Sequence, residues 1–520
     1  MSEIYDIAII GSGFAGSLLA MIARRLGRSV LLLERGKHPR FVIGESSTPL
    51  ANLLLEDLSV RYSLPSVAPL SKWGTWQRTY PQVGCGLKRG FTFYHHHFGH
   101  PAPVRSDRQD QLLVAASPHD DISDTHWYRP DVDLLLVQEA QKMGATYRDE
   151  VQLERARALD DFVRLEGTRH GEPVSCAARF VVDATGPRGF LHKALALPEL
   201  ALPRFPETAA LYTHFRDVRR MDQLHAIETP PYPVDDAALH HVFDGGWIWV
   251  LRFNNGITSA GVAATRGLAE RLRLQEGAPA WQRLLDLLPT VRDQFAGATA
   301  ARPFTYTPRL SFRSGSVAGK RWALLPSAAG FVDPLMSTGF PLVLFGVARL
   351  AEIIETDWES SNFQPALATY AEQTEADLLA TARLIGSLYA NLDNFPLFTS
   401  LSLLYFAAAS YAESVRRLGR PHLASSFLLH DQPGFKIEAA EIMERARLSH
   451  GPQQTEQLAR DILRVIEPFN IAGLGNQERR NWYPVDAEDF LNGSHKVGAT
   501  REEISRLLDA CGFWEAAVSR

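Results

Sequence analysis

The sequence opens on IYDIAII (residues 4–10), which is followed at once by the glycine-rich stretch GSGFAG (residues 11–16). The first stretch is apolar and rich in β-branched residues, as is typical of a strand buried on both faces. Residues 17–26 favour a helix, and residues 29–34 form a second apolar run that ends on an acid. Strand, G-x-G-x-x-G turn, helix, strand and acid in this order predict a dinucleotide-binding site in a Rossmann-like α/β fold.

Each glycine of the turn is expected to have its own role. Gly11 allows the tight turn, Gly13 lets the backbone approach a pyrophosphate, and Gly16 lets the helix pack closely on the strand. The pyrophosphate is expected at the positive end of the helix dipole, and Glu34 is expected to bind a ribose hydroxyl. The cofactor-binding residues predicted in this unit are therefore Gly11, Gly13, Phe14, Ala15, Gly16 and Glu34.

The composition narrows the class of protein. The chain has 520 residues, enough for two or three domains or for one large domain with insertions. Its content of 45% hydrophobic and 22% charged residues is typical of a soluble globular protein. A net charge of -5 provides no basic surface for nucleic acid. The three cysteines are widely spaced and fit neither a disulfide framework nor a metal site, so we expect no metal and a reducing, cytoplasmic location. The predicted first strand leaves no room for a signal peptide.

One uncharged stretch, residues 394–412, approaches the length of a membrane span. It contains proline and several polar residues, and no basic cluster flanks it. We therefore expect a buried helix, or one that covers a substrate, and no membrane association.

Further polar groups follow predicted strands. The loop over residues 38–49 leaves the second strand and carries Arg40 and Ser46; it is either part of a ligand site or a solvated connection. A buried strand over residues 178–183 ends on Asp183. Residues 330–339 enter a helix whose first backbone amides are expected to form an anion nest.

Residues 84–97 combine Lys88 with an aromatic strand and three consecutive histidines. A lysine beside such a strand is either a surface residue whose stem packs on apolar groups or a desolvated amine in a pocket. Along a strand, at most two of His95, His96 and His97 share a face. No carboxylate or cysteine stands at ligand spacing nearby, so the sequence predicts no metal site there.

Six segments together resemble the flavin-dependent halogenases. Within the family, the chain is more similar to the phenol and pyrrole halogenases than to the tryptophan halogenases. The segments are GSGFAG (11–16), GESSTP (44–49), GLKRGF (86–91), YRPDVD (128–133), LHHVFDGGWIWV (239–250) and FVDPLMSTG (331–339).

The resemblance implies a two-component, FADH2-dependent enzyme in which a flavin C4a-hydroperoxide oxidises chloride or bromide to hypohalous acid. Lys88 is then the catalytic residue that relays the halogen to a small electron-rich aromatic substrate. The sequence shows no second dinucleotide motif, so FADH2 is expected from a separate flavin reductase; a homodimer is possible. The resemblance assigns Arg40, Ser46, Arg129, Asp183, Asp333 and Gly339 to the cofactor, Ser337, Thr338 and Gly339 to halide, and Trp247 and Trp249 to the family's G-W-x-W motif.

The predicted organisation is a Rossmann-like FAD-binding domain over residues 1–205, interrupted by an antiparallel substrate-domain sheet over 206–310. The FAD-binding domain resumes over 311–360, and 361–520 form a helical region that covers the substrate site. Asn254-Asn255-Gly256 is expected to form a hairpin turn in the inserted sheet.

Two departures from the family pattern leave alternatives open. Met336 stands where tryptophan halogenases carry a glutamate, and Arg252 stands where the tryptophan motif usually ends in proline. The alternatives are a flavin monooxygenase or dehydrogenase on the same fold, and an inactive FAD-binding homologue. The proton acceptor is unassigned; His95, His97, His126 and His240 are candidates by residue type, although a structural role is favoured for each.

Overall fold

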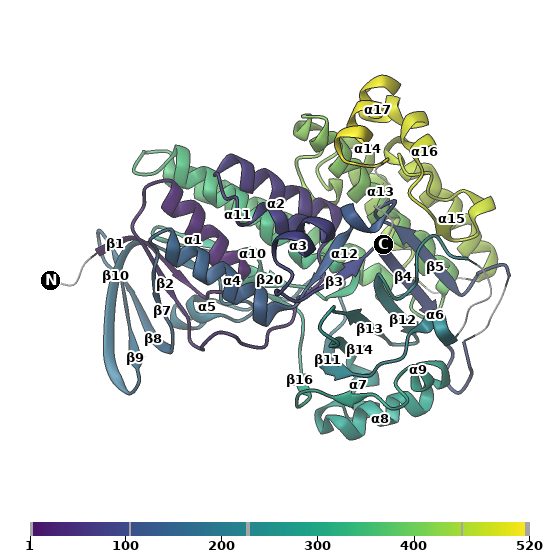
Figure 1. Cartoon of the computed structure of the whole chain (residues 1–520), viewed down its shortest axis with the longest axis horizontal. Coiled ribbons are helices and arrows are strands. Elements are labelled where there is room, and N and C mark those ends of the chain that lie inside the picture. The colour runs from purple at the N-terminus through teal and green to yellow at the C-terminus, as the bar shows by residue number, and fades with distance from the viewer. Residues whose placement is uncertain (1–3, 103–105, 225–228, 449–450, 515–520) are drawn as a thin grey trace.

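Two β-sheets lie side by side along the long axis of the computed structural model, and helices cover them (Figure 1). The structure describes residues 4–102, 106–224, 229–448 and 451–514. The sheet nearer the N-terminus is the Rossmann-like one. The other sheet lies beneath the helices of the C-terminal third of the chain.

The first sheet has parallel central strands, as its apolar sequence predicts. Its order is β18-β19-β10-β1-β2-β7, and β9 and β8 extend it from β10. Ile10 pairs with Asp183 on one side and with Leu33 on the other, so the carboxyl ends of β1, β10 and β2 meet at one edge. The strands are β1 (Ile4–Ile10), β2 (Val30–Leu33), β7 (Thr146–Arg148), β8 (Val151–Ala158), β9 (Val163–Arg169), β10 (Glu172–Asp183), β18 (Ala318–Gly319) and β19 (Trp322–Leu324).

Helix α1 (Phe14–Arg25) follows the glycine turn and packs against α4 (Arg129–Lys142) and α11 (Gly339–Thr356). Helix α2 (Pro49–Arg61) begins at a proline preceded by Thr48, whose hydroxyl accepts from the amide of Ala51 at 3.3 Å. A capped start with proline in the first turn is a typical helix beginning, and here it ends the loop that carries Ser46.

The second sheet is built mainly from antiparallel pairs, in the order β15-β11-β14-β13-β12-β4-β5-β21, with β16 also on β11. The turn at residues 254–256 joins β13 to β14 as predicted, and Gly256 has a φ of +76°. The strands are β4 (Gly90–His95), β5 (Gln111–Ala115), β11 (Thr208–Arg216), β12 (Ala238–Phe243), β13 (Gly246–Arg252), β14 (Thr258–Thr265), β15 (Thr299–Ala300), β16 (Thr305–Thr307) and β21 (Trp482–Tyr483).

This sheet extends beyond the predicted insertion, because β4, β5 and β21 come from outside residues 206–310. The division of the chain at residues 205, 310 and 360 stays a prediction. Four short strands form two separate two-stranded sheets: β3 (Cys85–Lys88) pairs with β6 (Asp124–Trp127), and β17 (Phe312–Arg313) pairs with β20 (Gly330–Phe331).

The remaining helices surround the two sheets. They are α3 (Trp73–Thr79), α5 (Phe190–Ala194), α6 (Met221–Leu224), α7 (Arg266–Leu272), α8 (Ala278–Leu287), α9 (Pro289–Gln294), α10 (Pro326–Ala329), α12 (Phe363–Tyr389), α13 (Phe395–Arg417), α14 (Pro433–Arg445), α15 (Pro452–Ile466), α16 (Ala487–Asn492) and α17 (Arg501–Ala510).

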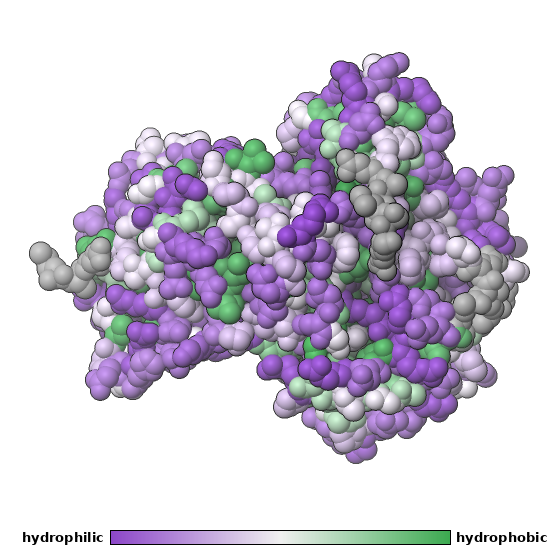
Figure 2. Space-filling model, viewed as in Figure 1, coloured by the Kyte–Doolittle hydropathy of each residue, from purple (hydrophilic) through white to green (hydrophobic). Residues whose placement is uncertain are grey.

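Two helical stretches, Leu335–Thr356 and Phe395–Arg417, are long and apolar enough to cross a membrane. Both are mostly buried inside the protein, 67% and 78% respectively, as core helices of soluble proteins are. On the face shown in Figure 2, hydrophobic residues are scattered among hydrophilic ones. The uncharged stretch from residue 394 is therefore an interior helix, as its composition predicts.

Candidate active site

Of the three glycines in the turn, Gly13 alone has its Cβ position free of backbone atoms. A Cβ at Gly11 would lie 2.7 Å from the carbonyl oxygen of Ala184, and one at Gly16 would lie 2.0 Å from that of Gly11. A Cβ at Gly13 would instead face Arg129 at 3.3 Å and Arg40 at 3.6 Å. Two guanidinium groups therefore lie beside the backbone of Gly13 at the start of α1. This arrangement fits an anionic pyrophosphate.

Glu34 lies beside this turn at the end of β2. Its carboxylate accepts from the amide of Ser12 at 3.1 Å and pairs with Arg40 at 3.2 Å. Burial opposes ionisation, but the charge of Arg40 and the hydrogen bonds from Gly36 and Ser12 prevail and lower the pKa of Glu34. An ionised acid at this position is suited to accept ribose hydroxyls.

Arg129 connects the turn to the loop over residues 38–48. It binds Asp133 through two hydrogen bonds of 2.9 Å, and it donates to the carbonyl oxygen of Gly44 at 2.8 Å. Its guanidinium also lies 5.1 Å from the ring of Phe14. Phe14 stacks on Phe340 at 4.7 Å, so the starts of α1 and α11 are in direct contact; Ala15 is buried beside it in the first turn of α1.

Asp183 lies at the predicted strand end, but its carboxylate binds its own turn. It accepts from the amide of Thr185 at 2.8 Å and from the amide of Leu191 at 2.6 Å. Burial raises the pKa of Asp183, and these hydrogen bonds lower it in part. Because this carboxylate is already hydrogen-bonded, we expect the backbone beside Asp183, and not its side chain, to contact a cofactor at this edge of the sheet.

Asp333 joins the segment before α11 to the tryptophan motif. Its carboxylate accepts from the hydroxyl of Tyr389 at 2.9 Å and lies 3.3 Å from Nε1 of Trp247. Burial raises the pKa of Asp333 to about 7. Trp249 is 5.7 Å from Trp247, ring to ring, and donates to Ser259 at 3.3 Å. Tyr389, on α12, was not found by sequence reasoning because no local motif marks it.

The predicted halide segment has an unusual backbone. Met336 and Ser337 both have positive φ, +65° and +52°, and Thr338 returns to the right-handed helical region at the start of α11. The step from a left-handed to a right-handed residue, here from Ser337 to Thr338, turns successive amides toward one point and is typical of an anion-binding nest. The amides of Thr338 and Gly339 open α11, where no intrahelical acceptor is available for them.

Lys88 is completely buried at the end of β3. Its ammonium donates to the carbonyl oxygen of Ser47 at 2.5 Å and lies 4.0 Å from the ring centre of Phe91. Of the two interpretations of this lysine, the structure supports a desolvated amine and not a surface residue. Its neighbours are aromatic: the Phe91 ring faces Tyr405 at 6.1 Å and Phe406 at 5.3 Å on α13.

Asp124 is the partner of Lys88 that the sequence did not reveal. The two residues stand opposite each other in the antiparallel β3–β6 pair, and both side chains are buried. Asn52 donates to Oδ1 of Asp124 at 2.7 Å, whereas Oδ2 is buried without a hydrogen-bond partner. Burial lowers the pKa of Lys88 and raises the pKa of Asp124, and the charge of each opposes the shift of the other.

One loop connects the halide segment with the lysine. The hydroxyl of Ser46 lies 3.2 Å from that of Ser337, and the next residue, Ser47, supplies the carbonyl that binds Lys88. Ser46 also forms a β-bridge with His126, which holds the loop on β6. The loop over residues 44–48 therefore lies between two predicted sites that are far apart in the sequence.

Two of the candidate histidines, His126 and His240, are poor bases at neutral pH. Burial, helped by the charge of Lys88, lowers the pKa of His126 to about 3. Burial likewise lowers the pKa of His240 to about 3.

The two residues that depart from the family pattern have ordinary surroundings. Met336 is buried. The guanidinium of Arg252 pairs with Asp235 at 2.9 Å and donates to the carbonyl oxygen of Val218 at 2.9 Å.

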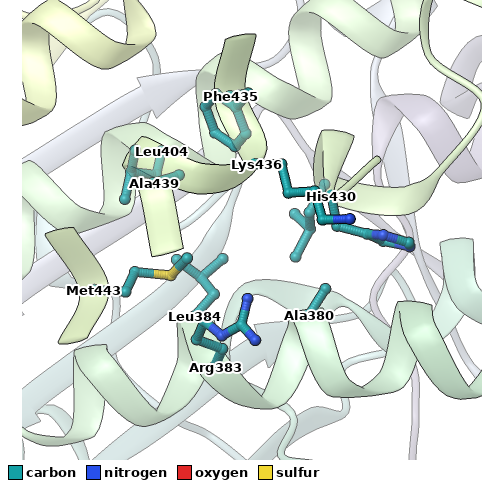
Figure 3. A pocket seen from close by; sticks show the side chains of 10 residues that line it. Ala380, Arg383, Leu384, Leu404, His430, Phe435, Lys436, Ala439 and Met443 are labelled. Atoms are coloured by element: carbon teal, nitrogen blue, oxygen red, sulfur yellow. The ribbon is translucent and has the colours of Figure 1, made fainter. Parts of the chain in front are cut away.

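A separate pocket lies among α12, α13 and α14 (Figure 3). Its volume is about 40 Å³, and Arg383, Leu404 and Phe435 are among the residues that line it. Pockets for small organic ligands usually measure about 300–1,000 Å³. We therefore do not assign the aromatic substrate to it.

Comparison with known proteins agrees with this geometry. Residues 125–394 match the family model described as tryptophan halogenase, and residues 9–66 match that of an NAD(P)-binding Rossmann-like domain. Monodechloroaminopyrrolnitrin halogenase PrnC of Pseudomonas fluorescens is 30% identical over 73% of this chain and 66% of its own length. Tetracycline 7-halogenase of Kitasatospora aureofaciens is 29% identical over 78% of this chain and 73% of its own length.

The solved structure of the halogenase PltM superposes with a TM-score of 0.80 at 25% identity, and covers 92% of this chain and 99% of its own. The chain belongs to the tryptophan halogenase family. It is a flavin-dependent halogenase, an oxidoreductase that uses FAD and halide, and the fold and family predicted from the sequence are confirmed.

Proposed function

We propose that this enzyme halogenates a small, electron-rich aromatic substrate of the phenol or pyrrole class, with Lys88 as the catalytic residue. The observation that carries the proposal is the loop whose Ser46 contacts Ser337 and whose Ser47 holds Lys88. The hydroxyl of Ser337 and the ammonium of Lys88 therefore contact adjacent residues of one loop, Ser46 and Ser47. The ring of Phe91 lies against that ammonium, and Tyr405 and Phe406 pack on Phe91, so the region is rich in aromatic rings, which suits a flat apolar substrate.

The substrate class is supported by what related proteins act on. A structure of PltM is a complex with phloroglucinol and FAD, and phloroglucinol is a phenol. Another relative is 1H-pyrrole-2-carbonyl-[peptidyl-carrier protein] chlorinase of Pseudomonas fluorescens, 26% identical over 69% of this chain. Phenol and pyrrole rings are both electron-rich, so an electrophilic halogen attacks them readily.

The residues of the glycine turn fit the cofactor. Gly11, Gly13 and Gly16 would carry the pyrophosphate of FAD between Arg40 and Arg129, and Glu34 would bind the ribose. The rest of the FAD molecule would lie near Ser46, Asp333 and Gly339. Asp183 would hold the backbone turn at the end of β10, beside the cofactor. Reduced FAD, when bound, supplies with oxygen the oxidising power that converts halide to hypohalous acid. The backbone amides of Thr338 and Gly339 would hold the halide beside Ser337, whose own amide donates to the carbonyl oxygen of Pro334 at 3.1 Å.

Lys88 and Asp124 then act on the hypohalous acid. The ammonium donates a hydrogen bond to its oxygen, which makes the halogen more electrophilic because the hydroxyl becomes a better leaving group. The ring attacks the halogen as the bond between halogen and oxygen breaks, and the hydroxyl leaves as water with a proton from the ammonium. The proton that the ring carbon then loses returns to the amine of Lys88 and restores the ammonium. Asp124, across the β3–β6 pair, keeps Lys88 protonated in a site that otherwise disfavours charge.

The partners and location follow from the same proposal. A separate flavin reductase supplies FADH2, because the chain has a single dinucleotide motif. The enzyme acts in the cytoplasm and does not bind nucleic acid or a membrane, and a homodimer is compatible with this mechanism. Direct reduction of bound FAD by NADPH in the purified protein would contradict the two-component arrangement.

The test combines purified protein with FAD, a flavin reductase, NADH and chloride or bromide. A panel of phenols, pyrroles and indoles is analysed by mass spectrometry for halogen isotope patterns. Wild type should give halogenated phenol or pyrrole. Lys88→Ala should consume oxygen without forming product, and product formation at the wild-type rate by this variant would refute the role of Lys88.

A further inference from the structure

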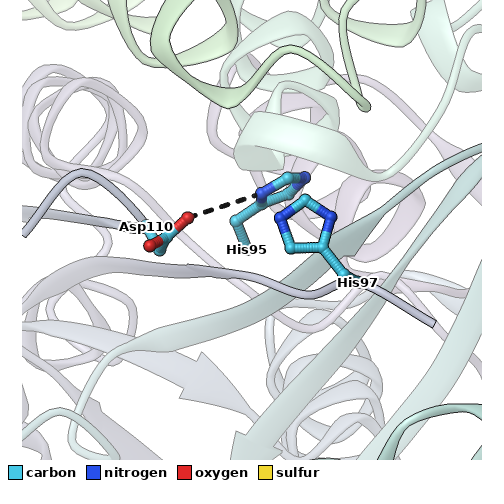
Figure 4. Close-up of side chains that lie close together, drawn as sticks. All are labelled: His95, His97 and Asp110. Atoms are coloured by element: carbon cyan, nitrogen blue, oxygen red, sulfur yellow. Dashed lines mark ion pairs between the residues drawn. The ribbon is translucent and has the colours of Figure 1, made fainter. Parts of the chain in front are cut away.

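Two histidines and one carboxylate come together at the far end of β4. His95 ends β4, His97 follows two residues later, and Asp110 immediately precedes β5. The antiparallel pairing of Tyr94 with Gln111 brings Asp110 beside His95, and their Nδ1 and Oδ1 atoms are 3.8 Å apart (Figure 4). One ligand atom from each of the three side chains lies within 4.8 Å of the other two.

The ring of His95 is fixed by groups outside the cluster. Its Nε2 lies 3.2 Å from the carbonyl oxygen of Leu392, so this nitrogen carries the hydrogen. Nδ1 is then left with its lone pair on the side of Asp110. The ring also stacks on Phe395 at 5.0 Å with an interplanar angle of 9°. A ligand histidine usually donates its second ring nitrogen to a carbonyl or carboxylate, which holds the ring in place.

We propose that His95, His97 and Asp110 bind a divalent first-row transition metal ion, of which Zn²⁺ is the representative. Two imidazoles and one carboxylate are a donor set suited to such ions. Ligand bonds of about 2.0–2.1 Å in tetrahedral geometry place donor atoms roughly 3.4 Å apart. His97 is exposed and Asp110 only partly buried, so rotation of these two side chains closes the remaining gap. Water completes the coordination.

The site would tie the edge of the second sheet to the start of α13. Leu392 and Phe395, which hold the ring of His95, lie at the entrance to this helix. Further along α13, Phe398 packs on Phe93 at 5.7 Å, and Tyr405 and Phe406 face the aromatic wall beside Lys88. A bound ion would therefore stabilise the helix that covers the candidate active site. The metal site does not depend on the proposed substrate or on the role of Lys88.

The test titrates Zn²⁺ into tag-free, chelator-treated protein in competition with a chromophoric chelator. One ion should bind per chain of wild type. His97→Ala and Asp110→Asn should each weaken binding at least about 10-fold, since each removes a ligand. His100→Ala is the matched control, because His100 is exposed and three residues from His97 but lies outside the cluster. This control should bind Zn²⁺ like wild type.

Two further measurements separate this site from casual binding. Zn²⁺ should raise the melting temperature of wild type and His100→Ala but not that of His97→Ala. Co²⁺ should give visible absorption bands that disappear in His97→Ala. Absence of stoichiometric Zn²⁺ binding by wild type, or equal binding by wild type and His97→Ala, would overturn the proposal.

Discussion

Replacing Asp124 with asparagine removes one charge from a buried pair and keeps the shape of the side chain. The charged atoms of Lys88 and Asp124 lie at the ends of two side chains that start from facing positions of the β3–β6 pair. For a charge separation of about 6 Å and an effective dielectric constant of about 20, two unit charges attract each other by about 3 kcal/mol. Because about 1.4 kcal/mol corresponds to one pKa unit, the loss should lower the pKa of Lys88 by about 2 units. Asn52 can still hydrogen-bond the new amide oxygen.

The assay is the pH dependence of kcat for halogenation with saturating reductase, FAD and halide. If the ammonium form of Lys88 is the active one, the alkaline limb of the profile should move to lower pH by about 2 units in Asp124→Asn. Activity should recover on acidification, which a mere folding defect would not reproduce. Asp120→Asn is the control, because Asp120 pairs with Arg89, the neighbour of Lys88, at 2.8 Å and should leave the limb in place. An unshifted limb in Asp124→Asn would refute the assigned coupling.

Three other variants test the remaining geometry. Gly13→Ala should weaken FAD binding at least about 10-fold by flavin absorbance titration, because the new methyl fills the pyrophosphate approach, whereas Gly267→Ala, with open space at its Cβ, should bind normally. Asp333→Asn should gain stability relative to wild type as pH rises from about 4 to about 7, measured by urea unfolding of the apoprotein. In that range the buried acid of wild type stays protonated and must release its proton on unfolding, which favours the unfolded state of wild type only. A constant difference between the two proteins would contradict the raised pKa. Gly86→Ala should lower the free energy of unfolding by about 1–3 kcal/mol in the same assay, because its Cβ would lie 1.8 Å from the carbonyl oxygen of Arg252. A decrease of less than about 0.5 kcal/mol would show that β3 can move away from this oxygen.

Much of the fold could be predicted from local patterns. The turn from Gly11 to Gly16, the buried strands and the hairpin at Gly256 each depend on residues that are neighbours in the chain, so spacing alone defines them. The extent of the second sheet could not be predicted. Strands β4, β5 and β21 join it from distant segments, and pairing between distant strands is decided by packing on both faces rather than by local preference.

The candidate site divides in the same way. Sequence motifs identified Lys88, Asp333 and the segment around Thr338 as candidate site residues. They did not predict which side chains these residues contact. Asp124 and Tyr389 carry no motif of their own. Their partners lie on other strands and helices, and only the folded chain brings the groups within hydrogen-bonding or Coulomb range.

The sequence by itself therefore determined the class of the protein, because a dinucleotide turn is a contiguous unit whose geometry follows from glycine, strand and helix in fixed order. Only the tertiary structure decided how that unit connects to chemistry. It placed Ser46 against Ser337 of the predicted halide segment and Ser47 against Lys88, and it set Asp124 opposite that lysine. The physical reason is that burial and charge pairing are properties of the packed interior, where the energy of an ammonium depends on neighbours that the order of residues does not specify.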